Sequence, residues 1–414
     1  MANGPMSGFR ALDLTDEKGF LCGKILADLG VDVIKVEKPG GDPARNIPPF
    51  YHDKPDPEKS LYWFAFNINK RSITLNLDTS EGQNLFRKLV EKADFVIESF
   101  PPGYMVELGL DYISLAEINP RIIMTSITPF GQTGPYANYK ASDIVVQAMG
   151  VLLGQQGEPD RAPVRTTVPQ AYMHAGADAA EATMMAHYYR DLTGEGQYVD
   201  VSAMESVLWV GGRALPFWDA SRIEVKRTAG LISTTGGRVT PGIWECKDGY
   251  VSLLLHGGTM GARTNARLTE WMETEQMAPH FMKEKDWENW DWANTTQAEL
   301  DSIQKAINDF FKTHTKKELE VKATKRGIQL NIICDSADTV ANVQLQARDF
   351  WENIEHDELN DTIIYPGAFA KFSLTPIGDW QRAPLIGEHN DDIYRLELGF
   401  SEHQVKALKA NGVI

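Results

Sequence analysis

The stretch FRALDLTDEKGFLCGKILADLGVDVIKV, residues 9–36, decides the fold class of this chain. A short apolar run at 9–14 is followed by a helix-like segment at 20–29 and by a β-branched run at 31–36. Two strands separated by a helix pair in parallel, because a parallel pair needs a crossover connection of this length. The stretch therefore predicts an α/β protein with a helix-covered parallel sheet.

The same alternation continues through the first 210 residues. Further strand-like runs follow at 72–77, 94–99, 121–127 and 197–201. A helix is predicted near residue 80 with Ser80 as its N-terminal cap, because Gln83 stands three residues later, as a capping box requires. A long helix rich in small residues is predicted at about 173–191, and Gly194 provides its C-terminal stop.

The composition changes near residue 225, where a Gly/Thr-rich linker begins. Two antiparallel strands joined at Asp248-Gly249 follow it, since Asp-Gly is a strong hairpin signal. Two helices are expected near 296–327, and strand-like sequence resumes at 328–334. The chain is therefore predicted to form a large α/β domain from both of its ends, residues 1–224 and 331–414, with a smaller α/β domain inserted at 225–330.

The composition excludes several classes of protein. Fifty-seven acidic and 41 basic side chains give a formal net charge of −16. With 43% hydrophobic and 24% charged residues, the chain has the composition of a folded protein rather than a disordered one. An acidic chain without a basic block offers no surface for nucleic acid or an anionic membrane. Because no apolar run approaches a membrane span and no signal-peptide pattern is seen, a cytoplasmic location is predicted.

Generic motifs do not identify a reaction. The junction DLTDEKGFLCG at 13–23 matches neither G-x-G-x-x-G nor G-x-x-x-x-G-K-[ST], which disfavours nicotinamide and P-loop enzymes. The chain has no G-x-S-x-G and no H-E-x-x-H, and its three cysteines are far apart. No metal site and no prosthetic group are predicted.

Seven runs taken together resemble the class III CoA-transferases. They lie, in the family's order, at 11–45, 67–77, 93–110, 119–143, 190–208, 244–253 and 384–393. The resemblance implies a Rossmann-like large domain built from both chain ends, a small middle domain, and an interlocked dimer in which each chain threads a ring formed by the other. It also implies that the substrates are CoA and acyl-CoA thioesters.

In this family an aspartate at the start of the long helix attacks the acyl-CoA thioester and carries covalent intermediates. With Gly176 and Gly194 as anchors, the family's spacing places this position on Tyr172. A phenol cannot form a thioester with CoA, because its oxygen bears no acyl carbon. Asp178 is the nearest later carboxylate, but six helical residues amount to about 9 Å of rise and about 240° of rotation. It therefore faces another way, and Glu181 is farther still.

The CoA-binding positions implied by the resemblance are altered as well. The candidate positions are Lys38, Asn76, Ser99, Phe100 and Lys140. Lys38 and Lys140 keep positive charges that suit phosphates. However, Asp78 stands where the family has a cation, Pro101 replaces an arginine, and Glu107 lies near a later basic site. These changes argue against CoA binding by this chain.

We therefore expect a catalytically silent subunit of a heteromeric CoA-transferase, paired with a paralogous partner that carries the aspartate and binds most of the CoA. The resemblance is greatest to the branch that moves CoA between succinyl-CoA and benzylsuccinate in anaerobic toluene degradation. One alternative is a self-sufficient transferase that uses a displaced carboxylate, Asp178 or Asp143. The other is a non-enzymatic acyl-CoA-binding or scaffold protein. Racemisation is disfavoured, because Ser142 replaces the histidine that the racemase branch needs.

Overall fold

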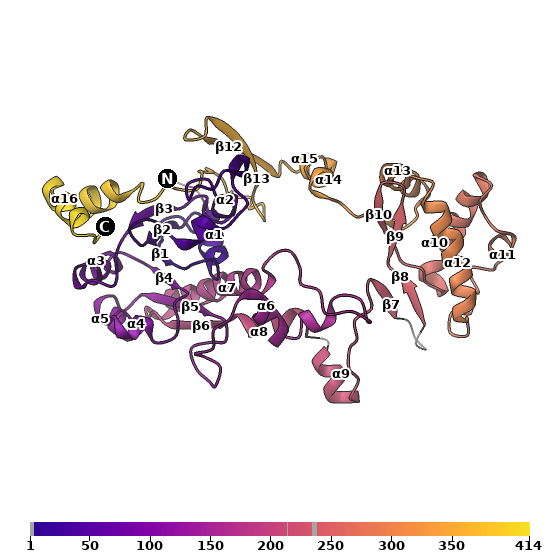
Figure 1. Ribbon diagram of the computed structural model, residues 1–414, viewed down its shortest axis with the longest axis horizontal. Helices are drawn as coiled ribbons and strands as arrows, with labels where there is room; N and C mark the ends of the chain where they lie inside the picture. The colour runs from indigo at the N-terminus through magenta and orange to yellow at the C-terminus, as the bar shows by residue number, and fades with distance from the viewer. Residues whose placement is uncertain (1–3, 213, 234–237) are drawn as a thin grey trace. The chain divides into compact units, whose positions relative to one another are not determined.

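A computed structural model describes residues 4–212, 214–233 and 238–414 (Figure 1). The chain divides into two compact units. The first comprises Met1–Leu153, Arg165–Glu224 and Gln346–Ile414, and the second comprises Gly154–Val164 and Val225–Leu345. The chain returns to the first unit at residue 346 rather than at the expected 331, because strand β11 (Leu330–Ile332) pairs with β10 (Gly249–Leu253) of the second unit.

A six-stranded parallel sheet forms the centre of the first unit. Its order is β3-β2-β1-β4-β5-β6, and every neighbouring pair is parallel. The strands are β1 (Arg10–Leu14), β2 (Asp32–Glu37), β3 (Arg71–Thr74), β4 (Phe95–Glu98), β5 (Ile123–Thr128) and β6 (Tyr198–Ser202). This is the strand order of a Rossmann fold, in which the order reverses between β1 and β4. The α/β prediction is confirmed, and all six expected strands form.

Helices cover both faces of this sheet, which explains why its central strands are apolar on both sides. One face packs under α3 (Ser80–Val90), α4 (Tyr104–Glu107), α5 (Tyr112–Ile118) and α16 (Glu402–Ala410). The other packs under α1 (Phe20–Asp28), α6 (Asp143–Met149), α7 (Gln170–Thr193) and α8 (Ala203–Val210). The expected capping residue of α3 was wrong by one position: Thr79, not Ser80, accepts the N–H of Gly82, at 3.0 Å.

Helix α7 carries the site of interest, and its small residues let it approach α1 closely. A Cβ atom on Gly176 would lie 2.8 Å from the Cβ of Leu21, so only glycine fits there. The helix begins at Gln170, three residues before the expected start, and ends as expected at Gly194, whose φ is +84°. A residue in this left-handed region is usually glycine.

A buried ionic cluster joins β1, β2 and the segment before β3. Asp13, Lys35 and Lys70 are all 0% exposed. Lys70 Nζ lies 2.8 Å from Asp13 Oδ2, and Lys35 Nζ lies 3.8 Å from Asp13 Oδ1. Burial alone would raise the pKa of Asp13, but the charges of Lys70 and Lys35 outweigh it, and the pKa is lowered. Gly23 is required beside the cluster, since a Cβ there would lie 2.2 Å from Asp13 Oδ2.

The second unit has a small antiparallel sheet of its own, in the order β11-β10-β9. Strands β9 (Ile243–Cys246) and β10 form the predicted hairpin at Asp248-Gly249. Its helices are α10 (Gly258–Thr274), α11 (His280–Lys283), α12 (Gln297–Phe311), α13 (Lys316–Arg326) and α14 (Ser336–Val340). The remaining elements of the chain are α2 (Leu61–Asn67), α9 (Ala214–Ser221), β7 (Leu231–Ser233), β8 (Val239–Pro241), α15 (Val343–Ala347), β12 (Trp351–His356) and β13 (Asp361–Pro366). Within the described residues, no helix has the length and apolar character needed to cross a membrane.

Replacing Asp13 with asparagine is expected to destabilise the first unit strongly. The change keeps the size of the side chain but leaves the buried Lys70 ammonium without its carboxylate, while Lys35 retains only Asp42, at 3.5 Å. A buried charge that loses its partner typically costs about 3–5 kcal/mol. Urea unfolding followed by circular dichroism measures the loss. The control is Glu402→Gln, which removes an exposed ion pair with Lys406 and should leave the midpoint unchanged. Equal midpoints for the two variants would contradict a structural role for the cluster.

Candidate functional site

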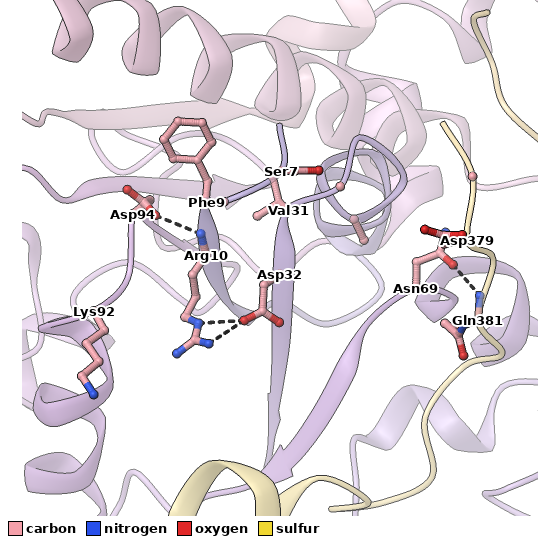
Figure 2. A pocket seen from close by; sticks show the side chains of 14 residues that line it. Ser7, Phe9, Arg10, Val31, Asp32, Asn69, Lys92, Asp94, Asp379 and Gln381 are labelled. Atoms are coloured by element: carbon pink, nitrogen blue, oxygen red, sulfur yellow. Dashed lines mark hydrogen bonds and ion pairs between the residues drawn. The ribbon is translucent and has the colours of Figure 1, made fainter. Parts of the chain in front are cut away.

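One cavity of the first unit lies at the amino ends of the strands. It measures about 830 Å³ and is lined by Arg10, Asp32 and Asp94, among others (Figure 2). These charged groups already have partners within the protein. Arg10 Nε donates to Asp32 Oδ2 at 2.8 Å, and Asp94 accepts the backbone N–H of Arg10 at 2.9 Å and lies 3.3 Å from the Arg190 guanidinium. Ligands of doubly wound folds bind at the opposite edge, outside the carboxyl ends of the strands. We therefore assign this cavity a structural role.

A smaller cavity of about 260 Å³ lies at the carboxyl ends of the strands, where the sheet order reverses between β1 and β4. We call it the crevice. Its lining residues are Leu14, Asp16, Val36, Glu37, Lys38, Asp42, Pro43, Leu75, Leu77, Ser99, Phe100 and Tyr104. They follow the ends of β1, β2, β3 and β4, the position that binds nucleotides in this topology. The crevice has an apolar floor and a charged rim.

Hydrogen bonds between the loops fix the walls of the crevice. Ser99 Oγ donates to Asp16 Oδ1 at 2.8 Å and accepts the Asp16 N–H at 2.9 Å, so the loops after β1 and β4 are joined. Arg45 clamps the loop after β2 by donating twice to Glu37, at 2.6 and 2.8 Å. Bidentate contacts of this kind hold geometry well. The crevice is thus built from loops with defined positions.

Three of the five expected CoA-binding residues line the crevice: Lys38, Ser99 and Phe100. The Lys38 ammonium is already paired, because its Nζ lies 3.0 Å from Asp78 Oδ2. Asp78 also accepts a 2.7 Å hydrogen bond from the Tyr104 hydroxyl. This hydrogen bond, followed by the Lys38 contact, lowers the pKa of Asp78. Asp78, which the resemblance places where the family has a cation, therefore pairs with the charge of Lys38.

The other two expected positions, Asn76 and Lys140, lie outside the crevice lining, and so does Glu107. Asn76 is occupied elsewhere: its side chain accepts the Asp78 N–H at 3.1 Å and donates to Gly412 at 3.3 Å. Lys140 is exposed in the loop between β5 and α6. Glu107 is exposed at the end of α4 and acts only through its charge, as one of the minor causes that raise the pKa of Tyr104 to about 12, after burial and Asp78.

Tyr172 lies in the first turn of α7, with 5% of its surface exposed. The start of this helix is capped by Asp143, whose Oδ1 accepts the N–H groups of Ala171 at 2.8 Å and of Tyr172 at 3.2 Å. Burial raises the pKa of the Tyr172 phenol, and the charges of Glu17, Asp16 and Asp143 raise it further. The phenol is therefore uncharged at neutral pH.

The two carboxylates named as substitutes for an aspartate at 172 do not resemble free nucleophiles in that position. Asp143 uses one oxygen to cap α7 and receives a hydrogen bond from Gln147 on the other. Asp178 is half-buried six residues along the helix, on a different side from Tyr172. Glu181 is exposed one turn beyond it.

Sequence reasoning missed Glu17, which the loop after β1 brings close to Tyr172. Its charge is the strongest of those that raise the pKa of the Tyr172 phenol, and it acts equally on Tyr62. Burial, followed by the charge of Asp16, raises the pKa of Glu17 itself. Asp16 also lines the crevice, so one short loop connects the crevice to Tyr172. No motif marks Glu17, and only the fold reveals its position.

The described residues contain no group of three or more His, Cys, Asp or Glu side chains arranged to hold a metal ion. The polar groups of the crevice and of the Tyr172 region are carboxylates, hydroxyls and one lysine. Such groups suit binding and charge stabilisation of an organic ligand.

Comparison with known proteins agrees with this architecture. The family model CoA-transferase family III matches residues 6–390. The succinyl-CoA:(R)-benzylsuccinate CoA-transferase subunit BbsE of Thauera aromatica is 34% identical over 99% of this chain and 98% of its own. The succinyl-CoA–L-malate CoA-transferase beta subunit of Chloroflexus aurantiacus is 29% identical over 99% of this chain and 98% of its own. The crystal structure of a CAIB/BAIF family protein from Brucella suis superposes with a TM-score of 0.82 at 30% identity, covering 96% of this chain and all of that one. The chain therefore belongs to CoA-transferase family III.

Proposed function

We propose that this chain is the catalytically silent subunit of a heteromeric CoA-transferase, and that a paralogous partner carries the nucleophilic aspartate. The observation that carries the proposal is Tyr172, a buried phenol at the start of α7, where the family's spacing calls for a carboxylate. Covalent transfer needs a group that becomes an acyl anhydride and then a thioester. A phenol has no carbonyl carbon to hold CoA, so this chain cannot follow that route at Tyr172.

The crevice is the part of this chain that we propose as its CoA site. The apolar floor of Leu14, Val36 and Leu77 suits the adenosine end of the molecule, and Lys38 is the cation within reach of its phosphates. However, Asp16, Glu37 and Asp42 line the same crevice, and Asp78 occupies Lys38. Phosphates bind best where cations are free and carboxylates are few. We infer that the partner binds CoA predominantly.

The proposed substrates follow the named relatives. The relatives with subunit names act on succinyl-CoA, one with benzylsuccinate and the other with L-malate. We propose a dicarboxylic acyl-CoA such as succinyl-CoA as the donor and a carboxylic acid such as benzylsuccinate as the acceptor. Membership of a degradation pathway for aromatic compounds is part of the same proposal.

Exposed apolar side chains support a permanent partner. Met185, Tyr188 and Leu192 are 63, 69 and 69% exposed on α7, and Trp209 on α8 is 86% exposed. Met185, Tyr188 and Leu192 follow helical spacing and form a stripe, which in a lone soluble protein is uncommon. We propose that the paralogous partner covers this stripe in an interlocked heterodimer.

A self-sufficient transferase is the second candidate, and Glu17 is the observation that favours it. The charge of this carboxylate raises the pKa of the Tyr172 phenol more than the charge of Asp16 or of Asp143 does. A carboxylate there could in principle take over the attack on the thioester. The two candidates differ in which chain becomes covalently labelled.

Trapping during turnover should distinguish the two candidates. We expect the purified chain alone to transfer no CoA from succinyl-CoA, and the complex with its partner to be active. Borohydride reduction during turnover, followed by peptide mapping, should label an aspartate of the partner only. A label on Glu17, Asp143 or Asp178, with activity from the chain alone, would contradict the silent role. Binding of acyl-CoA without any transfer by the complex would indicate a sensor or scaffold.

Freeing Lys38 should strengthen CoA binding. In Asp78→Asn the 3.0 Å ion pair is lost, so the ammonium becomes available to a phosphate. Because an exposed ion pair contributes little, the expected gain in CoA affinity is about two- to fivefold, measured by isothermal titration calorimetry. Lys38→Ala should weaken binding. Glu107→Gln is the matched control, since Glu107 lies outside the crevice lining. An unchanged affinity in both Asp78→Asn and Lys38→Ala would remove the crevice from the proposed CoA site.

A further inference from the structure

A second cavity of about 360 Å³ is lined by the last residue of β4, by residues within β5 and by the first residue of β6. The crevice is lined by Ser99, Phe100 and Tyr104, whereas this cavity is lined by Pro101, Gly103 and Met105. The segment 99–105 is therefore a wall shared by both. We call this second space the β5 cavity. Its lining residues are Glu98, Pro101, Gly103, Met105, Val106, Asp111, Tyr112, Ile113, Met124, Ser126, Gln132 and Tyr198.

Three polar side chains from adjacent strands meet at the floor of the β5 cavity. Glu98 and Ser126 are direct neighbours in the β4–β5 register, and Met124 is the neighbour of Tyr198 in β5–β6. Glu98 is 2% and Ser126 is 1% exposed. Ser126 lies beside both the Glu98 carboxyl and the Tyr198 phenol. Although the Ser126 hydroxyl is buried close to both groups, it makes no hydrogen bond of regular geometry within the described part of the chain. A buried hydroxyl of this kind needs a partner, and the cavity is the place for one.

The electrostatics of the floor favour a particular kind of ligand. Burial is the largest cause that raises the pKa of Glu98 to about 7, and the charge of Asp200 adds to it. These effects outweigh the contacts with Ser126 and the Phe100 N–H and the charge of Lys18, which act in the opposite direction. Its Oε2 accepts the Phe100 N–H at 2.7 Å. Among the lining residues two are carboxylates, Glu98 and Asp111, and none is Lys, Arg or His. A negatively charged ligand is therefore disfavoured in the cavity, whereas a cationic ligand would stabilise the buried Glu98 carboxylate.

We propose that the β5 cavity binds a small primary amine with an aromatic or branched apolar body, its ammonium group held by Glu98, Ser126 and Tyr198. The ammonium has three N–H donors, which match one carboxylate and two hydroxyl oxygens. The body of the ligand packs between Met105, Met124 and Ile113. The volume lies within the range of small-molecule sites, which are mostly apolar with a few polar groups that fix orientation.

This site differs from the proposed CoA site in ligand and in position. CoA is a polyanion and is proposed to bind in the crevice, whereas the polar side chains that line the β5 cavity are carboxylates, hydroxyls and the amide of Gln132. The proposal therefore does not depend on the proposed function. Its failure would leave the assignment of the crevice unchanged, and a failure of that assignment would leave the β5 cavity intact.

Three probes of similar shape and different charge test the proposal: 2-phenylethylamine, 2-phenylethanol and phenylacetate. Calorimetry with the full-length chain at about pH 8 should show the amine binding about tenfold or more tightly than the alcohol, with phenylacetate weakest. The affinity for the amine should fall by about tenfold for each pH unit below about 7, because Glu98 becomes protonated and neutral while the amine stays charged. The alcohol should show no such dependence.

Substitutions of the residues proposed to hold the ammonium group test whether the amine binds in the β5 cavity. Glu98→Gln keeps the size of the side chain and an acceptor for the Phe100 N–H, and it should abolish both the preference for the amine and its pH dependence. If that variant fails to fold, Ser126→Ala and Tyr198→Phe provide the same test through smaller losses of affinity. Glu117→Gln on the exposed side of α5 is the charge-matched control and should bind as the parent does. No saturable binding of the amine, tighter binding of phenylacetate, or a preference that survives Glu98→Gln would overturn the proposal.

Discussion

The ionic contact between Asp13 and Lys70 is the constraint on which the rest of the first unit depends. It is fully buried, and Lys35 adds a second positive charge to the same carboxylate. Because an uncompensated charge is so costly in the interior, the three residues must come together whenever the unit folds. This fixes the end of β1 relative to β2 and to the segment before β3. The loop that begins at Thr15 therefore leaves the sheet in one direction only.

That loop links the structural constraint to the chemistry. Thr15 is held by Asp13, with its hydroxyl 2.6 Å from Oδ1, and Asp16 is held by Ser99. Glu17 is thereby placed close to Tyr172. The same few residues thus form one wall of the crevice and the surroundings of the phenol. A rigid sheet edge presents both a nucleotide-type crevice and a neutral side chain at the start of α7, an arrangement suited to binding without covalent transfer.

Much of this architecture could be predicted from the sequence. Each strand of the sheet is a short apolar run, and each is separated from the next by helical sequence or a loop, so the parallel sheet follows from local patterns. Lys38, Ser99 and Phe100 were expected in the binding region and do line the crevice. Asn76 and Lys140 were expected there and do not, because an amide can be used by the chain terminus and a loop lysine can point to solvent. The spacing of residues in the sequence does not predict either of these placements.

Other features depend on contacts between distant segments and were not predictable. The role of Asp143 as the cap of α7 joins residues 28 positions apart, and the approach of Glu17 to Tyr172 joins residues 155 positions apart. The β5 cavity likewise requires the register of three strands. Residue 331 was a poor boundary for the same reason, since the pairing of β11 with β10 is set by the second unit and not by the local sequence.

The acidic surroundings of Tyr172 have an evolutionary consequence. A single base change converts a tyrosine codon into an aspartate codon, so on the proposed function the lost nucleophile is genetically close. The electrostatic surroundings nevertheless disfavour an aspartate at position 172, because the charges of Glu17, Asp16 and Asp143 already oppose a negative charge there. Like charges disfavour ionisation, so the reverted aspartate would be a weak nucleophile. On the proposed function, these carboxylates would make a return to covalent transfer at position 172 unfavourable.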